Sequence, residues 1–169
     1  MATQSTLSDH LFLLDTLEDH QDHIVQLLNK GQYSVLLMSE ELNPHLFEQT
    51  EVIESFSRIA RNGAVTDVRL IIKNPQSMVD NNPKLLNLAR RLPSKISIQT
   101  LTIDPPDNKA FMLVDENSMW LQHDHQIIVG ENTGFANSDA RAEVKQYKER
   151  FKELWRYSQS DVRLRTLSL

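Results

Sequence analysis

The stretch that decides the fold runs Asn108-Lys109-Ala110-Phe111-Met112-Leu113-Val114-Asp115-Glu116-Asn117-Ser118-Met119-Trp120-Leu121. Two apolar runs, 111–114 and 119–121, flank a short polar group that begins with Asp115. Short apolar runs separated by Asp, Asn and Ser are typical of two strands joined by a tight turn. The stretch therefore predicts a buried β-hairpin.

This hairpin resembles the signature segment of the phospholipase D superfamily, which reads His-x-Lys, four residues, Asp, six residues, then Gly-Ser-x-Asn. When Asp115 is aligned with the motif aspartate, Asn108 takes the histidine position and Ala110 takes the lysine position. The resemblance thus marks six vestigial motif positions, of which only the aspartate keeps its residue type: Asn108, Ala110, Asp115, Gln122, His123 and His125.

The two replaced residues at the start of the motif carry the chemistry that the resemblance implies. A histidine nucleophile attacks through an unshared ring nitrogen, and a lysine stabilises the charge on the phosphate oxygens. The asparagine amide of Asn108 is not basic, and Ala110 carries no charge. Shifting the alignment by one residue brings Lys109 to the lysine position but moves Asp115 out of its own. The sequence therefore predicts that the chain is not an enzyme.

The resemblance extends over residues 20–160, because the order of the expected elements is that of one phospholipase D half-domain. Apolar runs at Val35–Met38 and Val68–Ile72 predict strands, and apolar residues at helical spacing predict helices between them. The fold class we expect is α/β, with a mixed, mainly parallel sheet and helices on both faces. The first helix should end at Gly31 with a left-handed cap.

A narrower resemblance points to a degenerate, single-copy bacterial version of this domain. It rests on segments such as Leu85–Leu92, Gly134–Asn137 and Phe151–Trp155. That version is a domain of unknown function often appended to the C-terminus of GNAT-type acetyltransferases. The resemblance implies a protein partner, which includes a second copy of the chain in a homodimer.

Length and composition predict one compact domain. The chain has 169 residues, of which 40% are hydrophobic. We expect residues 1–16 to form a flexible N-terminal segment and residues 17–169 to form a single phospholipase D-like domain. There is no cysteine, and no apolar run suits a signal sequence or a membrane span. A cytoplasmic protein without cofactor and without membrane contact is expected.

The most readable surface is a helix near the C-terminus, for which Ser138 is the expected N-cap. Its apolar stripe runs from Ala140 to Trp155, and five basic residues line up beside that stripe: Arg141, Lys145, Lys148, Lys152 and Arg156. These residues are candidates for anion binding, either to nucleic acid or to a phosphate ligand. A solvated helix face with internal ion pairs is the alternative, and it is favoured.

Histidines provide the remaining candidates. The pair His123 and His125 flanks Asp124, and His20 and His23 alternate with acidic residues on the first helix. Neither group has the ligand spacing of a metal site, so no metal is expected. A residual phosphodiesterase would need His123 or His125 as nucleophile, with Lys109 or Arg141 on the phosphate.

The function predicted from the sequence is therefore that of a noncatalytic phospholipase D-like module for interaction or regulation. The first alternative is nucleic-acid or phosphate binding through the basic helix, and the second is a residual phosphodiesterase. The acidic first 60 residues, with ten carboxylates against Lys30 and Arg58, argue against a protein that coats nucleic acid with its whole surface.

Overall fold

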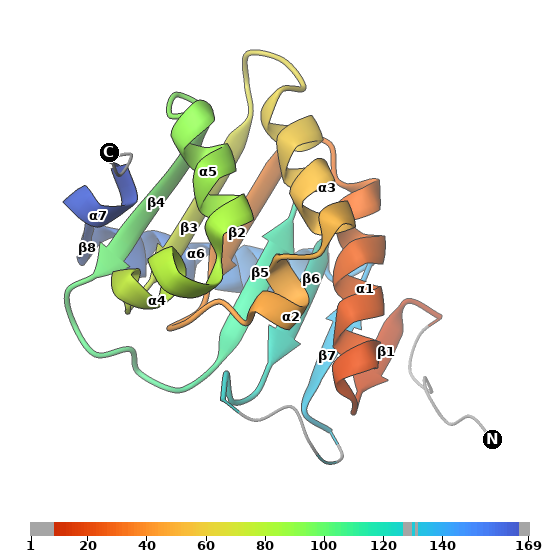
Figure 1. Ribbon diagram of the computed structural model, residues 1–169. Coiled ribbons are helices and arrows are strands. Elements are labelled where there is room, and N and C mark those ends of the chain that lie inside the picture. The colour runs from red at the N-terminus through yellow and green to blue at the C-terminus, as the bar shows by residue number, and fades with distance from the viewer. Residues whose placement is uncertain (1–8, 127–129, 131, 166–169) are drawn as a thin grey trace.

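A computed structural model of the chain describes residues 9–126, 130 and 132–165. Within these residues the strands form one sheet of eight, in the order β1-β7-β6-β5-β2-β3-β4-β8 (Figure 1). Their bounds are β1 Leu11–Leu14, β2 Ser34–Met38, β3 Asp67–Ile72, β4 Ile96–Leu101, β5 Ala110–Val114, β6 Ser118–Gln122, β7 Gly134–Asn137 and β8 Ser158–Gln159. The predicted hairpin of β5 and β6 is confirmed, and it lies in the middle of the sheet.

The sheet is mixed, as expected, but its strands are not mainly parallel. Only β2–β3 and β3–β4 are parallel, while the other five pairs between described strands are antiparallel. The reason is that β5, β6 and β7 follow one another without a helix that returns the chain to the same end of the sheet. The parallel arrangement is limited to the part where helices alternate with strands.

Helices cover both faces of the sheet, which confirms the expected fold class (Figure 1). One face carries most of the helices, and α6 lies alone on the other. The helices are α1 Leu17–Lys30, α2 Pro44–Phe47, α3 Thr50–Ala60, α4 Pro75–Asn81, α5 Pro83–Arg91, α6 Arg141–Arg156 and α7 Val162–Arg165. None of the helices in the described residues is both long enough and apolar enough to cross a membrane.

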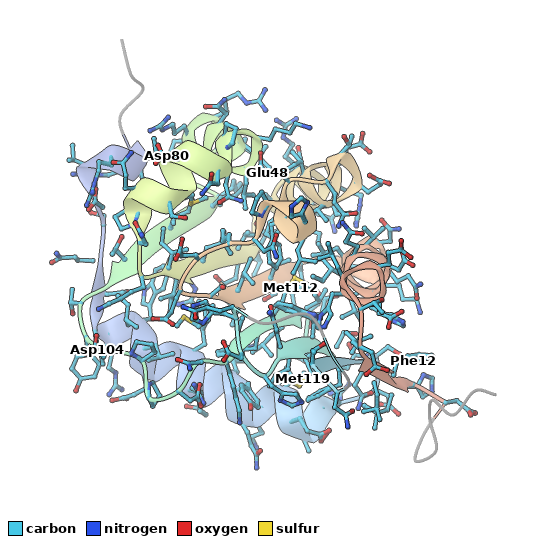
Figure 2. All side chains as sticks on the ribbon, turned by 60° about the horizontal axis from the view of Figure 1, so that its bottom comes forward. Phe12, Glu48, Asp80, Asp104, Met112 and Met119 are labelled. Carbon is cyan, nitrogen blue, oxygen red and sulfur yellow. The ribbon has the colours of Figure 1, made fainter. Side chains whose placement is uncertain are left out.

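The central hairpin is apolar on both sides because each of its faces borders a separate core. Met112 and Trp120 belong to the core under α1, α3 and α5, whereas Leu113 and Met119 belong to the core under α6. Met112 and Met119 accordingly point to opposite sides of the sheet (Figure 2). All ten residues of β5 and β6 are buried, so the hairpin reads as two continuous apolar runs.

The N-terminal segment needs a correction. Leu11–Leu14, which we expected within a flexible stretch, form β1 and pair with β7, with Leu14 opposite Gly134. The partner strand lies more than 100 residues away, so the local sequence shows no sign of the pairing. Residues 1–8 of that stretch, and residues 166–169 of the expected domain, lie outside the described residues.

Two expected helix caps are also different in the structure. Gly31 follows α1 with φ −67° and ψ 143°, an extended and not a left-handed conformation. A glycine fits at this position because it has no side chain: a Cβ there would come within 2.7 Å of Val114 Cγ1 and 2.8 Å of Ile59 Cδ1. Ser138 does not cap α6: the N-cap is Ala140, whose N–H donates to Asn117 O over 2.8 Å.

Candidate functional site

The six vestigial motif positions do not lie together. Asn108, Ala110 and His125 gather where β5 begins and β6 ends, because Ala110 pairs with Gln122 across the hairpin. Asp115 follows the last residue of β5 and therefore stands at its opposite end. Five strand residues separate the two ends by about 16 Å. The candidate site is consequently the end that holds Asn108, Ala110, Gln122, His123 and His125.

Asp115 has a structural role at the turn between β5 and β6. Its carboxylate accepts three backbone N–H groups, from Gln32 (3.0 Å), Tyr33 (3.0 Å) and Ser34 (3.0 Å). Asp115 also has φ 56°, a left-handed conformation that Asp tolerates better than most residues. The carboxylate thus joins this turn to the loop that follows α1, and this role accounts for the aspartate without any chemistry.

The side chain of His125 is largely enclosed, with 5% of its surface exposed. Its Nε2 lies 3.1 Å from Glu40 Oε2, and its Nδ1 lies 3.2 Å from the carbonyl oxygen of Asn108. The N–H of His125 donates to the same carbonyl over 2.8 Å. Both ring nitrogens therefore face oxygen atoms, one from Glu40 and one from the Asn108 carbonyl. Attack on a phosphate would require one ring nitrogen to give up its contact.

Of the other vestigial positions at this end, only His123 carries a group that could act as a nucleophile. Ala110 is fully buried, and Gln122 is 2% exposed with its Nε2 donating to Asp124 O over 2.8 Å. His123 is exposed, and its ring centroid lies 6.5 Å from that of Phe135. The asparagine side chain of Asn108 is exposed as well, while its carbonyl holds His125.

Two of the cations near this end are held by other groups. Arg150 makes a bidentate ion pair with Asp107, at 2.7 and 3.0 Å, and this hydrogen-bonded guanidinium lowers the pKa of the Asp107 carboxyl. Lys73 Nζ donates to Ile103 O over 2.9 Å and lies 3.6 Å from the carboxylate of Asp104. Arg141 pairs with Glu116, next to Asp115 at the opposite end of β5, so it does not lie beside His125. Of the two phosphate-binding candidates, only Lys109, which directly precedes β5, stands at the same end as His125.

The basic stripe of α6 divides into two halves. Lys152 lies 3.6 Å from Glu149 and Arg156 lies 3.2 Å from Glu153, so the second half carries its own counter-charges. In the first half, Arg141, Lys145 and Lys148 border a surface hollow of about 270 Å³ together with Glu116 and Val144. The first half therefore offers most of the cationic surface that the sequence predicts.

A buried polar network around His20 was not found by sequence reasoning. Trp120 Nε1–H donates to His20 Nδ1 over 2.9 Å, so the ring proton sits on Nε2, which lies 2.9 Å from Thr133 Oγ1. Thr133 Oγ1 then donates to Leu14 O over 3.0 Å. His20 is fully buried, and this burial lowers the pKa of its imidazole to about 4. A Cβ at Gly134 would stand 2.8 Å from His20 Cε1, so the network needs a glycine beside it.

This network removes His20 from the histidine candidates on the first helix. His20 points into the core, where both of its nitrogens are used, and only its neighbour His23 lies near the surface. The sequence signal that marks His20 is its place among Leu17, Ile24 and Leu28 on the apolar side of α1. Among the described residues no group of three or more His, Asp or Glu side chains is arranged to hold a metal ion.

The fold is the one seen in phospholipase D family members of known structure. Nuc from Salmonella typhimurium, a phospholipase D family member, is 11% identical and superposes with a TM-score of 0.59, over 85% of this chain and 89% of that chain. NucT from Helicobacter pylori is 12% identical with a TM-score of 0.62, over 89% of this chain and 97% of that chain. Identities this low show a shared fold and nothing more.

The chain belongs to the family described as Domain of unknown function (DUF7931), which matches residues 16–167. A further structure of the same fold is TrmBL2, an archaeal chromatin protein with a novel mode of DNA binding. It is 14% identical with a TM-score of 0.67, and the match covers 93% of this chain but only 56% of TrmBL2, so this chain spans about half of that protein. A search among curated proteins found no match.

Proposed function

We propose that this protein is a noncatalytic phospholipase D-like module that acts by binding another protein. The observation that carries the proposal is the set of contacts of His125, whose two ring nitrogens face Glu40 and the Asn108 carbonyl. Ala110, at the position of the phosphate-binding lysine, is buried and uncharged. Asn108 and Ala110 supply neither the nucleophile nor the cation at the two motif positions on which the superfamily's usual reaction depends.

The proposal is tested with an activated diester, bis(p-nitrophenyl) phosphate. We expect no hydrolysis above the rate in buffer, because these two motif positions supply neither the nucleophile nor the cation. The His125→Ala variant and its exposed neighbour His123→Ala serve as a matched pair, with circular dichroism to show that both fold. Hydrolysis by the unchanged protein that disappears in either variant, while that variant still folds, would establish a residual phosphodiesterase and contradict the proposal.

The partner that we propose is a protein in the bacterial cytoplasm. The resemblance noted in the sequence suggests an acetyltransferase of the GNAT type, or a second copy of the chain, as two forms of that partner. Co-purification from the native cell followed by mass spectrometry tests the first form. Light scattering across micromolar concentrations tests the second, because a monomer throughout that range would exclude a stable homodimer.

A second candidate function is binding of single-stranded nucleic acid or a phosphate ligand by the first half of α6. Arg141, Lys145 and Lys148 lie within eight consecutive residues, about 10 Å along the helix, and border one hollow. That TrmBL2, a DNA-binding protein, has the same fold supports this candidate. The short span suits contact with few phosphates.

Charge reversal separates this function from general electrostatic attraction. The double variant Lys145→Glu, Lys148→Glu should weaken the binding of labelled single-stranded DNA by about tenfold or more at low salt, as fluorescence anisotropy measures. The matched double variant Lys152→Glu, Arg156→Glu changes the net charge equally but alters residues that already pair with Glu149 and Glu153. This candidate function would be contradicted if both double variants lost the same amount of affinity for single-stranded DNA, or if the unchanged protein did not bind the DNA at low salt.

A further inference from the structure

The outer edge of β4 is only partly covered. The ladder with β8 consists of Thr100 opposite Gln159 and Leu101 opposite Ser158, and Thr102 N–H continues it by donating to Tyr157 O over 2.7 Å. Successive residues of a strand direct their backbone groups to alternate sides. Since the N–H of Thr102 points outward, that of Ile98 points outward too, beyond the end of β8. Among the described residues no strand pairs with the outer side of residues 96–99, which therefore present an open strand edge there.

A groove runs along this open edge. It has a volume of about 370 Å³ and lies between β4, the end of α5 and α7, with Ile96, Ile98, Pro93 and Leu164 among its lining residues. Figure 1 shows α7 and β8 at the side of the sheet where β4 is the last long strand. Branched apolar side chains beside free backbone donors and acceptors are what an added strand contacts. The groove occupies the place that a longer β8 would fill.

The charged residues that line the groove are two arginines. Arg90 and Arg165 line it, and no carboxylate is among its lining residues. Arg90 is fixed in position because its Nε and Nη2 donate to Leu164 O (3.2 Å) and Arg163 O (2.6 Å) at the end of α7. The exposed Arg165 stands on α7 itself. The nearby carboxylate of Asp161 is paired with Arg163 over 2.9 Å, so acidic side chains on an added strand would find two guanidinium groups that line the groove.

The opposite edge of the sheet lacks these features. There β1 is the outermost strand, and the hollow beside it, lined by residues that include Phe12 and His23, has a volume of only about 40 Å³. An extended peptide needs a strand edge and pockets for alternate side chains. Of the two outer edges of the described sheet, only β4 combines an open ladder with a groove of suitable size.

We propose that residues 96–99 of β4 dock an extended acidic peptide segment of the partner protein, which pairs with the strand edge and fills the groove beside α7. The inference rests on the proposed function, because it specifies how a noncatalytic module holds its partner. Hydrogen bonds between the peptide backbone and the backbone of Ile98 supply affinity. The apolar lining of the groove selects every second side chain of the peptide, and the two arginines select acidic residues at the ends of the peptide.

The test uses the full chain and a labelled eight-residue peptide in which valine and threonine alternate between glutamates at both ends. Three control peptides carry lysines at the ends, the same residues in scrambled order, or N-methyl groups on the bonding side. Fluorescence anisotropy reports binding, and hydrogen exchange reports the Ile98 amide. We expect binding of the acidic peptide alone, slowed exchange at Ile98, and about tenfold weaker binding in Arg165→Glu. Arg156→Glu, an equal charge change on α6, should bind as the unchanged protein does.

Three results would overturn the inference. The first is peptide binding that does not slow hydrogen exchange at the Ile98 amide, or whose affinity is lowered equally by Arg165→Glu and Arg156→Glu. The second is no binding of the acidic peptide. The third is dimerisation, seen by light scattering, that protects Ile98 without any peptide, since a second copy would then be the occupant. The proposed function would fail separately, if the protein hydrolysed the diester in a way that depends on His125. It would still hold if a partner protein captured from the cell bound the Arg165→Glu variant as well as the unchanged protein, although the peptide-docking inference would then be wrong.

Discussion

Acidification from pH 7 to pH 4 should lower the free energy of unfolding by about 3 kcal/mol through His20 alone. In the unfolded chain the imidazole takes up a proton near its ordinary pKa of 6.5, whereas in the folded protein burial lowers the pKa of His20 to about 4. Between these values the unfolded state binds more protons, so stability falls as the pH falls. The contribution is fully present above pH 6.5 and is lost progressively down to about pH 4.

Urea unfolding at a series of pH values measures this effect. The His20→Gln variant should be less stable at pH 7, because the Trp120 N–H loses its well-placed acceptor, but its stability should change by about 3 kcal/mol less between pH 7 and pH 4. His23→Gln is the matched control: burial lowers the pKa of His23 too, but its side chain is less enclosed, so the change in slope should be smaller. An unchanged pH dependence in His20→Gln would show that His20 is not buried as a neutral ring.

Replacement of Asp115 by alanine should destabilise the protein by about 3 kcal/mol. Three backbone N–H groups, those of Gln32, Tyr33 and Ser34, lose a charged acceptor at once. Alanine also tolerates φ 56° poorly, which adds about 1 kcal/mol to the cost. The variant should still resemble the unchanged protein in every binding assay at temperatures where it is folded, because Asp115 does not belong to the candidate site.

Two further variants at this position separate the causes. Asp115→Gly relieves the backbone but supplies no acceptor, so it should cost about 2 kcal/mol, and Asp115→Asn keeps one carbonyl oxygen and should cost about 1 kcal/mol. Midpoints of urea unfolding give the order of the three variants. If glycine proved as stable as aspartate, the left-handed backbone and not the hydrogen bonding would explain why this position carries Asp115.

The sequence predicted the parts of the fold that depend on local pattern. Two continuous apolar runs around Asp115 predicted the hairpin, and the apolar stripe of α6 is buried as expected at Val144, Phe151 and Leu154. These features follow from residues close in the chain, since strand and helix periods are read within a few turns. The parallel strands β2 and β3 are likewise short apolar runs, each preceding a helix, and both are confirmed.

The candidate site was predictable only in its residue types. The replacement of the motif histidine and lysine by Asn108 and Ala110 can be read from the letters alone, because the identity of a side chain determines whether it is basic. The contact between His125 and Glu40 was not predictable, because it joins segments 85 residues apart. The position of Asp115 at the far end of β5 was likewise not predictable, because it depends on where the strand begins and ends in the structure.

What the sequence by itself determined is the α/β class, the central hairpin and the absence of a basic side chain at Asn108 and Ala110, since each follows from residue identity or local period. Only the tertiary structure decided which side chains and strands from distant segments contact one another. The burial of His20 against Trp120, the pairing of β1 with β7 and the open edge of β4 all depend on contacts between distant segments. Such contacts form because the whole sheet buries its apolar faces together, and no short stretch of sequence contains that information.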